Sequence, residues 1–176
     1  MKIKKKLFSI ITLLSLCLLF FSFTEIGNNS NIEHKNSGTI YIVRHAEKVK
    51  EGENPDLTAY GHQRAQELAN YLKNGNIEGM YATDFLRVKN TAKPLADKLG
   101  IEVEIYKKKK TKSLMKDILK KGGNHLVVGH WGTANEAFSY FKVAPEYNTE
   151  EANNDNRILK VTYSENKLVE VVLLTY

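Results

Sequence analysis

The sequence predicts an α/β domain with a largely parallel sheet over residues 38–176, and three observations support this fold class. Short apolar runs that suit buried strands alternate with amphipathic segments at helical spacing. The distinctive polar residues follow the ends of those predicted strands. The chain has 176 residues, 42% of them hydrophobic, and a single cysteine. This composition suits one globular domain and excludes an intramolecular disulfide framework or a Cys-rich zinc module.

Each predicted strand is a short apolar run, and each predicted helix repeats apolar residues at intervals of three and four. In chain order the predicted elements are strand 39–43, helix 65–72, strand 79–82, helix 88–99, strand 101–105, helix 114–119, strand 125–129, helix 134–141 and a hairpin of 157–163 with 167–174. Pro94 is expected to kink or split the second helix, and Gly100 to end it. Thr111 or Ser113 is the expected cap of the third helix. The hairpin is expected to turn around Glu165 and Asn166.

The first 24 residues have the composition of a targeting segment. Lys2, Lys4, Lys5 and Lys6 precede residues 7–23, which hold 13 apolar residues and no charge. We therefore expect a signal peptide or membrane anchor in 1–24, a polar linker in 25–37, and a protein that is secreted, periplasmic or anchored to the outer face of the cytoplasmic membrane. Membrane attachment would run through residues 7–23.

A third alternative is a lipoprotein, since the residues before Cys17 resemble a lipobox, although Leu16 stands where that pattern has a small residue. The formal net charge of the chain is +6, from 26 basic and 20 acidic residues. Without the four N-terminal lysines, 22 basic and 20 acidic residues remain, a net charge of +2. The basic balance is therefore no argument for nucleic-acid binding.

The candidate site residues each follow a predicted strand. Arg44 and His45 follow the first strand, Thr83 and Arg87 the second, and His130 the fourth. Ligands bind at the carboxyl ends of the strands in open α/β sheets, so these side chains are expected to meet. Two guanidinium groups suit a phosphoryl group, and a neutral imidazole can attack its phosphorus. A second, protonated histidine would add positive charge opposite the transferring oxygens.

Four sequence blocks resemble the histidine phosphatase superfamily in order and spacing. They are Ile42-Val43-Arg44-His45-Ala46-Glu47-Lys48, Leu57-Thr58-x-x-Gly61-x-x-Arg64-Ala65, Tyr81-Ala82-Thr83-Asp84-x-x-Arg87-x-x-x-Thr91-Ala92 and Val127-Val128-Gly129-His130-x-x-Thr133. The resemblance covers about 39–142 and is nearest to short single-domain bacterial members. It implies a three-layer α/β/α sandwich of the phosphoglycerate mutase-like type and phosphoryl transfer through a phosphohistidine.

The resemblance also implies residue roles. His45 would be the nucleophile, Arg44 and Arg87 the phosphate clamps, and a charged His130 would stabilise the transferring phosphoryl group. Lys48, Thr83 and Thr133 are further candidate substrate-binding residues. No metal and no cofactor are implied, because the positive side chains can neutralise a dianionic phosphate. His45 must then present one unprotonated nitrogen, which requires its other nitrogen to donate to a carbonyl or similar acceptor.

The sequence departs from the family at two places. Many members have a glutamate after the third strand that protonates the leaving oxygen, but the segment 105–116 has no carboxylate. Glu47 is the preferred substitute, and Glu53, Asp56, Glu150 and Glu151 are alternatives. If no acid is needed, phosphoramidates or activated substrates are favoured over alkyl esters. Trp131 follows His130 where small polar residues are common, and it is expected to be a packed aromatic, with pocket lining as the alternative.

We therefore expect a phosphatase acting on a phosphomonoester or phosphoramidate, with a small phosphorylated molecule or a phosphoprotein as substrate. A phosphomutase is disfavoured, because the span from Arg87 to His130 is short. A non-catalytic phosphate-binding or scaffold module at the cell envelope is the alternative of another class. The run Lys107–Lys110 with Lys112 has one neighbouring aromatic and no reader motif, so nucleic acid is not an expected partner. On the rim of the site it could attract anionic substrates or contact lipid headgroups. The sequence does not specify the oligomeric state.

Overall fold

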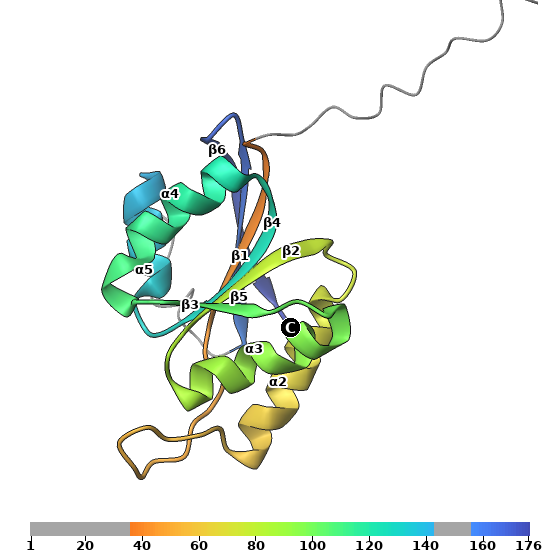
Figure 1. The fold of residues 1–176 in the computed structure, drawn as a ribbon, viewed down its shortest axis with the longest axis vertical. Coiled ribbons are helices and arrows are strands. Elements are labelled where there is room, and N and C mark those ends of the chain that lie inside the picture. The colour runs from red at the N-terminus through yellow and green to blue at the C-terminus, as the bar shows by residue number, and fades with distance from the viewer. Residues whose placement is uncertain (1–35, 143–155) are drawn as a thin grey trace, which may run out of the picture. The chain divides into compact units, whose positions relative to one another are not determined.

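The fold is that of a computed structural model, which describes residues 36–142 and 156–176 (Figure 1). The expected targeting segment 1–24 and all but the end of the linker 25–37 lie outside the described residues. Glu150 and Glu151, two alternatives for the missing acid, lie outside them as well. Among the described residues, no helix has the length and apolar character needed to cross a membrane.

Strands and helices alternate along the chain up to the C-terminal hairpin, as the sequence predicts. The elements are β1 (Gly38–Arg44), α2 (Ala59–Leu72), β2 (Ile77–Thr83), α3 (Leu86–Leu99), β3 (Val103–Tyr106), η1 (Lys108–Lys110), α4 (Thr111–Lys121), β4 (Gly123–Gly129), α5 (Thr133–Phe141), β5 (Arg157–Ser164) and β6 (Lys167–Thr175). Glu165 and Asn166 form the turn between β5 and β6, both with positive φ, as a two-residue hairpin turn of type I′ requires.

The six strands form one sheet in the order β3-β2-β4-β1-β5-β6. The first four strands along the chain run parallel, and β5 and β6 add an antiparallel edge. β1 and β2 are not neighbours, because β4 lies between them and pairs with both. The sheet is therefore mostly parallel, as predicted.

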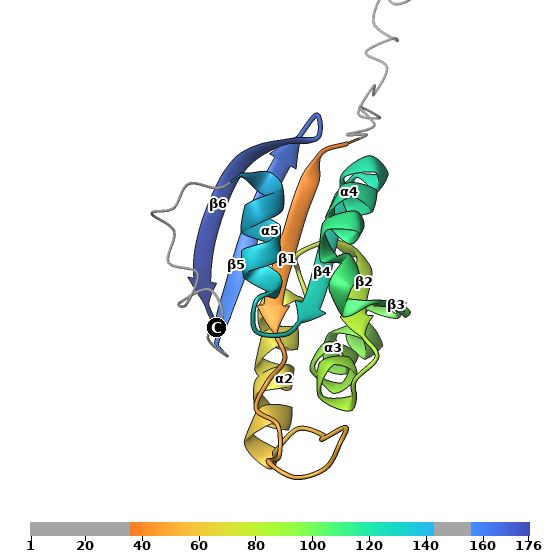
Figure 2. The same ribbon diagram turned by 90° about the vertical axis from the view of Figure 1, so that its left-hand side faces the viewer.

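Two helices cover each face of the sheet, which gives three layers (Figures 1 and 2). The residues of α4 and α5 pack in one core cluster with one side of the sheet, and those of α2 and α3 pack in another with the opposite side. On β4, Val127 belongs to the first cluster while Leu126 and Val128 belong to the second. This alternation is the expected result of a strand that is buried on both faces. The three-layer α/β/α sandwich is thus confirmed.

Three local expectations are corrected. β3 is shorter and later than the predicted strand, because only Val103–Tyr106 pair with β2. α3 is continuous through Pro94 and is not split. Thr111 does not cap α4: it is the first helical residue, and its hydroxyl donates to the carbonyl of Lys108. Lys110 stands at the N-cap without a side-chain hydrogen bond.

Candidate active site

The site lies where the chain leaves β1 and β4 in opposite directions. These two strands are parallel neighbours, and Arg44 pairs with Gly129 at their carboxyl ends. The helix after β1 is α2, which covers one face, whereas the helix after β4 is α5, which covers the other (Figure 2). In open α/β sheets, ligands bind at the carboxyl ends of adjacent strands whose connections diverge in this way. His45 and His130 are the first residues after these two strands, and their ring centroids lie 5.6 Å apart.

His45 is held in one orientation by hydrogen bonds to backbone. Its amide donates to the carbonyl of Gly129 at 3.0 Å, and its ring Nδ1 lies 2.8 Å from the carbonyl oxygen of Ala46. Because a carbonyl can only accept, Nδ1 must carry the proton, and Nε2 of the neutral ring is left unprotonated. The side chain is buried, with 6% of the residue exposed. The sequence requirement for a donating second nitrogen is met by this contact.

His130 lies against two side chains, Thr83 at the end of β2 and Phe85 directly before α3. Its Nε2 is 2.8 Å from the hydroxyl of Thr83, and the ring of Phe85 packs edge-on against it at 5.1 Å. The pKa of His130 is lowered to about 4, first by burial and then by electrostatic interaction with His45 and with the cations Arg87, Lys108 and Arg44. His130 is therefore neutral at pH 7 in the ligand-free protein. The sequence-based expectation of a charged His130 concerns the state with a phosphate bound beside it and stays a prediction; without an anion, burial favours the neutral ring.

The lowered pKa of His130 makes the stability of the protein depend on pH. Between pH 6.5 and about 4 the unfolded chain takes up a proton at His130 and the folded chain does not. We expect the free energy of unfolding to fall as the pH is lowered through this interval, in urea titrations of the full chain at several pH values.

Burial also lowers the pKa of His125, so His125 makes the free energy of unfolding fall with pH in the same direction. Comparison with the variant His130→Asn separates the part of this pH dependence that comes from His130. The variant should show a shallower pH dependence than the wild type. Equal slopes in the two proteins would contradict the assignment to His130.

The two predicted arginine clamps each lie over an aromatic ring. The guanidinium carbon of Arg44 is 5.2 Å from the ring centroid of Trp131, and that of Arg87 is 4.6 Å from the centroid of Phe85. Such contacts hold a guanidinium flat while its N–H groups stay directed outward along its edge. Trp131 is 53% exposed, so it is not the packed aromatic that the sequence suggests but a surface on which Arg44 rests.

Arg87 also carries a donor that the fold does not use. Its Nε is buried and has no hydrogen-bond partner among the described residues. Burial lowers the pKa of Arg87 as well. A buried, unsatisfied guanidinium N–H is costly unless an acceptor arrives, so this donor is suited to an anionic ligand.

Thr91 joins the segment after β1 to the helix that carries Arg87. Its hydroxyl donates to the carbonyl of Arg87 at 2.7 Å and accepts from the amide of Ala46 at 2.9 Å. Thr91 is 1% exposed, so neither backbone group can turn to water if the hydroxyl is lost. One buried hydroxyl therefore sets the spacing between the residue after His45 and the first turn of α3.

Replacing Thr91 by the isosteric valine should destabilise the protein by about 2 kcal/mol, because a buried amide loses its acceptor. The matched variant Thr91→Ser keeps the hydroxyl and loses one methyl group, at a cost of about 0.8 kcal/mol. Urea unfolding of both variants measures the difference. If serine is as destabilising as valine, the hydroxyl does not carry the effect.

Glu47, the preferred substitute acid, is engaged elsewhere. Its Oε1 accepts from Nη1 of Arg64 at 2.8 Å, and Arg64 is buried. Arg64 also donates to the hydroxyl of Tyr176 at 2.7 Å. The Glu47 carboxylate thus fastens the segment after His45 to α2 and, through Arg64, to Tyr176, which follows β6. Lys48, which follows it, is exposed and forms an isolated bridge with Leu57.

The other alternative acids and the predicted threonines also have defined places. Asp56 accepts from Asn90 and from the amide of Leu57, and these bonds lower its pKa. Glu53 is exposed. Thr83 reaches the site through His130, as described above. Thr133 is buried, and its hydroxyl accepts from the His130 amide at 2.9 Å, so its contact is with the turn.

Two motif glycines are explained by close approach. A Cβ at Gly129 would stand 2.2 Å from Oγ1 of Thr133, and one at Gly61 would stand 2.2 Å from the carbonyl oxygen of Glu47. Only glycine lets α5 begin so close to the end of β4, and only glycine lets the segment after His45 lie on α2. Both glycines therefore serve the placement of the two histidines.

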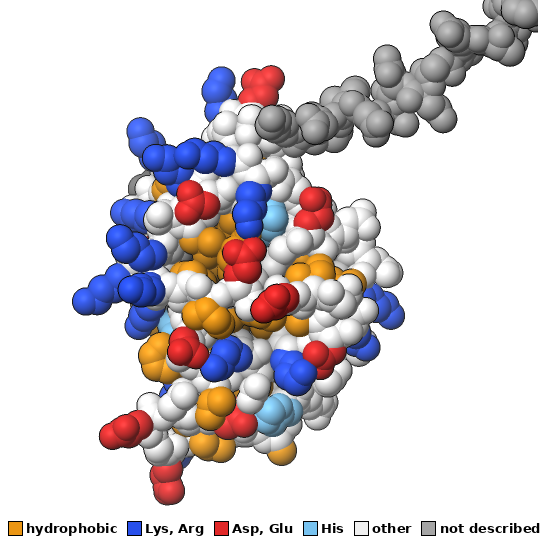
Figure 3. All heavy atoms as spheres, in the orientation of Figure 1, with side chains coloured by type: hydrophobic (Ala, Val, Ile, Leu, Met, Phe, Trp, Pro, Cys, Tyr) orange, Lys and Arg blue, Asp and Glu red, His pale blue; other side chains and the backbone are white. Residues whose placement is uncertain are grey.

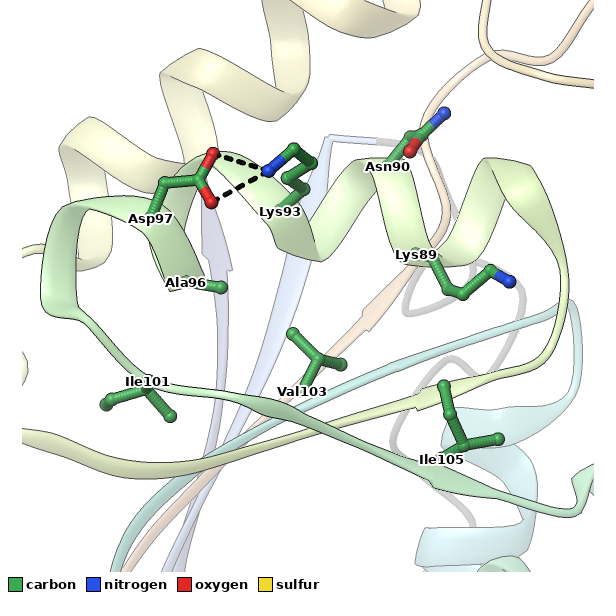
Figure 4. Close-up of a pocket in the computed structure, with 8 residues that line it drawn as sticks. All are labelled: Lys89, Asn90, Lys93, Ala96, Asp97, Ile101, Val103 and Ile105. Carbon is green, nitrogen blue, oxygen red and sulfur yellow. Dashed lines mark hydrogen bonds and ion pairs between the residues drawn. The ribbon is translucent and has the colours of Figure 1, made fainter.

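Two cavities lie away from this site. One, of about 270 Å³, lies between α3 and β3, where Ile101, Val103 and Ile105 face the Lys93–Asp97 ion pair (Figure 4). The other, of about 330 Å³, is lined by α2 and α3 residues, including His62 and Pro94. Neither is lined by a predicted site residue. Among the described residues, no group of three or more His, Cys, Asp and Glu side chains is placed to hold a metal ion.

The site contains residues that the sequence reasoning did not single out. Phe85 contacts both His130 and Arg87, and Thr91 and Arg64 were noted only as parts of motifs. The signal for Thr91 and Arg64 was their place in the motif blocks. No sequence pattern marked Phe85 as a site residue, because a single aromatic residue before a helix is as compatible with core packing as with a binding site.

Comparison with known proteins supports both the fold and the motifs. A model of the histidine phosphatase superfamily (branch 1) matches residues 40–110. No curated protein sequence matches the chain. A solved structure of the protein histidine phosphatase SixA in complex with tungstate shares 18% sequence identity at a TM-score of 0.65, over 78% of this chain and 96% of that chain.

Two further structures have the same fold. A phosphoglycerate mutase from Bacillus anthracis str. Sterne is 16% identical, with a TM-score of 0.65 over 80% of this chain and 95% of that chain. A phosphoserine phosphatase from Entamoeba histolytica, in complex with 3-phosphoglyceric acid, is 14% identical, with a TM-score of 0.55 over 76% of this chain and 96% of that chain. At these identities the likeness concerns the fold. The match over residues 40–110, together with this fold and the order of the motifs, makes the chain similar to the histidine phosphatase superfamily.

Proposed function

We propose that this protein is a phosphatase that works through a covalent phosphohistidine on Nε2 of His45. The observation that carries the proposal is the contact of His45 Nδ1 with the Ala46 carbonyl, 2.8 Å long, in a ring that lies beside His130. With the proton on Nδ1, Nε2 of the neutral ring is the unprotonated nitrogen, at the carboxyl ends of β1 and β4. A neutral, oriented imidazole of this kind is a competent nucleophile toward phosphorus.

The reaction would take two displacements at phosphorus. First the Nε2 lone pair of His45 forms an N–P bond while the bond from phosphorus to the leaving group breaks, and the leaving group keeps the electron pair. Water then attacks the phosphohistidine, the N–P bond breaks, inorganic phosphate leaves, and the proton of the water passes to solvent. His45 returns to its starting state.

Three further side chains would stabilise the transferring group. Arg44 and Arg87 offer planar guanidinium forks, and Arg87 has a buried donor that awaits an acceptor. His130 is neutral before binding, but a dianion beside it would raise its pKa and favour the imidazolium, which then donates to a phosphoryl oxygen. We propose that these charges replace a metal ion, so that activity survives treatment with a chelator.

The contacts of Glu47 favour substrates with a good leaving group. Its Oε1 is paired with Arg64 at 2.8 Å, so the carboxylate is held toward α2 by this ion pair. Phosphoramidates, phosphohistidine among them, depend less than alkyl phosphates on an acid of the protein that protonates the leaving group. SixA, which shares this fold, is described as a protein histidine phosphatase. We therefore propose a phosphoramidate, on a small molecule or a phosphoprotein, as the preferred substrate class.

The test is a panel assay with the full chain in mild detergent. It compares phosphoramidate, a phosphohistidine peptide, a phosphoserine peptide and an aryl phosphate, and intact-mass measurement after an acid-free quench detects the phosphoryl adduct. We expect turnover in the order phosphoramidate above aryl phosphate above phosphoserine, with the adduct on His45. Phosphate binding without turnover of any substrate would indicate the non-catalytic alternative, and an adduct on another residue would overturn the assignment of His45.

We also propose that residues 1–24 direct export, with residues 7–23 cleaved off or retained as an anchor. The support is the basic start followed by 13 apolar residues among 17. Cell fractionation and N-terminal sequencing of the mature protein test this. Recovery of the intact chain in the soluble cytoplasmic fraction would contradict it.

A further inference from the structure

A dense group of lysines covers the outer side of α4 and the turn before it. We call Lys107–Lys110, Lys112, Lys116 and Lys120 the α4 lysine face. All seven side chains are exposed, and Asp117 is the one acidic residue in the segment 107–121. Figure 3 shows Lys and Arg side chains gathered on the side of the molecule where Figure 1 places α4. Among the described residues none of these lysines forms an ion pair with a carboxylate.

Folding does not account for this charge. The inner side of α4 packs through Leu114, Met115, Ile118 and Leu119. Lys112, Lys116 and Lys120 recur at intervals of four and so form a row on the outer side. Several of the lysines also oppose the helix dipole, because Lys110 stands at the N-cap and the first turn holds no acid. Lysines at a helix N-terminus are unfavourable, and among the described residues no ion pair with a carboxylate compensates for them. We take this as a sign that the charge serves a function.

The α4 lysine face extends from the neighbourhood of His130 to the place where the chain enters β1. At one end, Lys108 is near enough to His130 to be among the charges that lower its pKa. At the other end, α4 finishes at Lys121, and Gly123 donates its amide to the carbonyl of Ser37, just before β1. The chain therefore enters the domain beside the end of α4. Residues 24–37 separate this point from the apolar segment 7–23 and reach at most about 50 Å when extended.

We propose that the α4 lysine face docks on a bilayer of anionic phospholipids, with the lysine ammonium groups against the headgroup phosphates. A tether through residues 7–23 would keep the face close to the bilayer, so that individually weak charge contacts suffice. Nucleic acid fits less well, because Tyr106, the one aromatic residue next to the lysines, is 9% exposed and offers no stacking surface. The docking is independent of the proposed catalytic activity.

Amine labelling of the full chain on vesicles tests the proposal even when residues 7–23 insert into the lipid. The chain is mixed with neutral phosphatidylcholine vesicles or with vesicles that contain phosphatidylglycerol, and the labelling of each lysine is read by mass spectrometry. Lys112, Lys116 and Lys120 should label about fivefold or more slowly on the anionic vesicles. Lys73 and Lys98, exposed at the ends of α2 and α3, are internal controls and should change little. Salt at about 1 M should remove the protection.

Two charge-reversal variants with the same change in net charge test whether the α4 lysine face, and not the overall positive charge of the protein, causes the protection. The variant with Lys116→Glu and Lys120→Glu should lose the protection of Lys112, whereas the matched variant with Lys73→Glu and Lys98→Glu should keep it. Both variants should unfold on heating at the same temperature as the wild type, which checks that they fold whether or not the proposed activity holds. Equal labelling on the two kinds of vesicle would overturn the proposal, and so would protection by a DNA duplex without protection by anionic vesicles.

Discussion

Replacing His45 by alanine should lower kcat/KM for a phosphoramidate substrate on the order of 10³-fold or more, with no phosphoryl adduct left on the protein. The ring nitrogen that attacks phosphorus is then gone, and water must attack the substrate directly. The backbone at this position is fixed separately, by the bond from the His45 amide to the carbonyl of Gly129, so the fold should survive the loss of the ring. Steady-state kinetics and intact-mass measurement of the two proteins check the result.

The control is His62→Ala, the same substitution at a side chain that is 52% exposed and lies near Asp56. This variant should keep its activity and its adduct. Activity of His45→Ala within tenfold of the wild type would contradict a nucleophilic role. A loss in both variants would point to destabilisation, which thermal unfolding of the two proteins would reveal.

Replacing Arg87 by lysine should lower kcat/KM by about 10²-fold, although the positive charge is kept. Lysine is a point charge that cannot present two parallel N–H groups or lie flat on Phe85. The variant Arg87→Ala, which loses charge and fork together, should fall by about 10³-fold. Inorganic phosphate, tested as a competitive inhibitor, should bind the variants more weakly than the wild type, and Arg87→Ala more weakly than Arg87→Lys.

Lys89→Gln is the matched control for Arg87, because it removes one cation from the same helix. Lys89 pairs with Asp84 at the surface, so its loss should change kcat/KM by less than about twofold. If Arg87→Lys retains full activity, charge alone suffices and the two-pronged clamp is wrong. If the losses fall on kcat with phosphate inhibition unchanged, Arg87 acts in the transition state and not in binding.

The sequence was sufficient to predict the fold class because its main signals are local. Buried parallel strands appear as continuous apolar runs, and the order of strands and helices follows from them, as 39–43 and 125–129 illustrate. The convergence of His45 and His130 was predictable in turn, because both follow parallel strands. Strand order was not predictable in this way, since no local signal says that β4 enters between β1 and β2.

The protonation of His130 and the engagement of Glu47 could not be read from the sequence. Both depend on contacts with residues far along the chain: His130 with Thr83 and Arg87, and Glu47 with Arg64 and Tyr176. The same holds for Trp131, whose exposure depends on how the turn after β4 is directed. Residue type and spacing predicted which side chains meet at this edge of the sheet, and tertiary contacts decided their ionisation and orientation.

The insertion of β4 between β1 and β2 affects when the site can form during synthesis. A nascent chain that ends before Gly123 already carries His45 and Arg87, but the strands that position them share no hydrogen bonds. Only when residues 123–129 join does the amide of His45 gain the carbonyl of Gly129 as its acceptor. His45 is thus synthesised early and oriented late, so a partly made chain has this imidazole without the geometry that the proposed phosphoryl transfer needs.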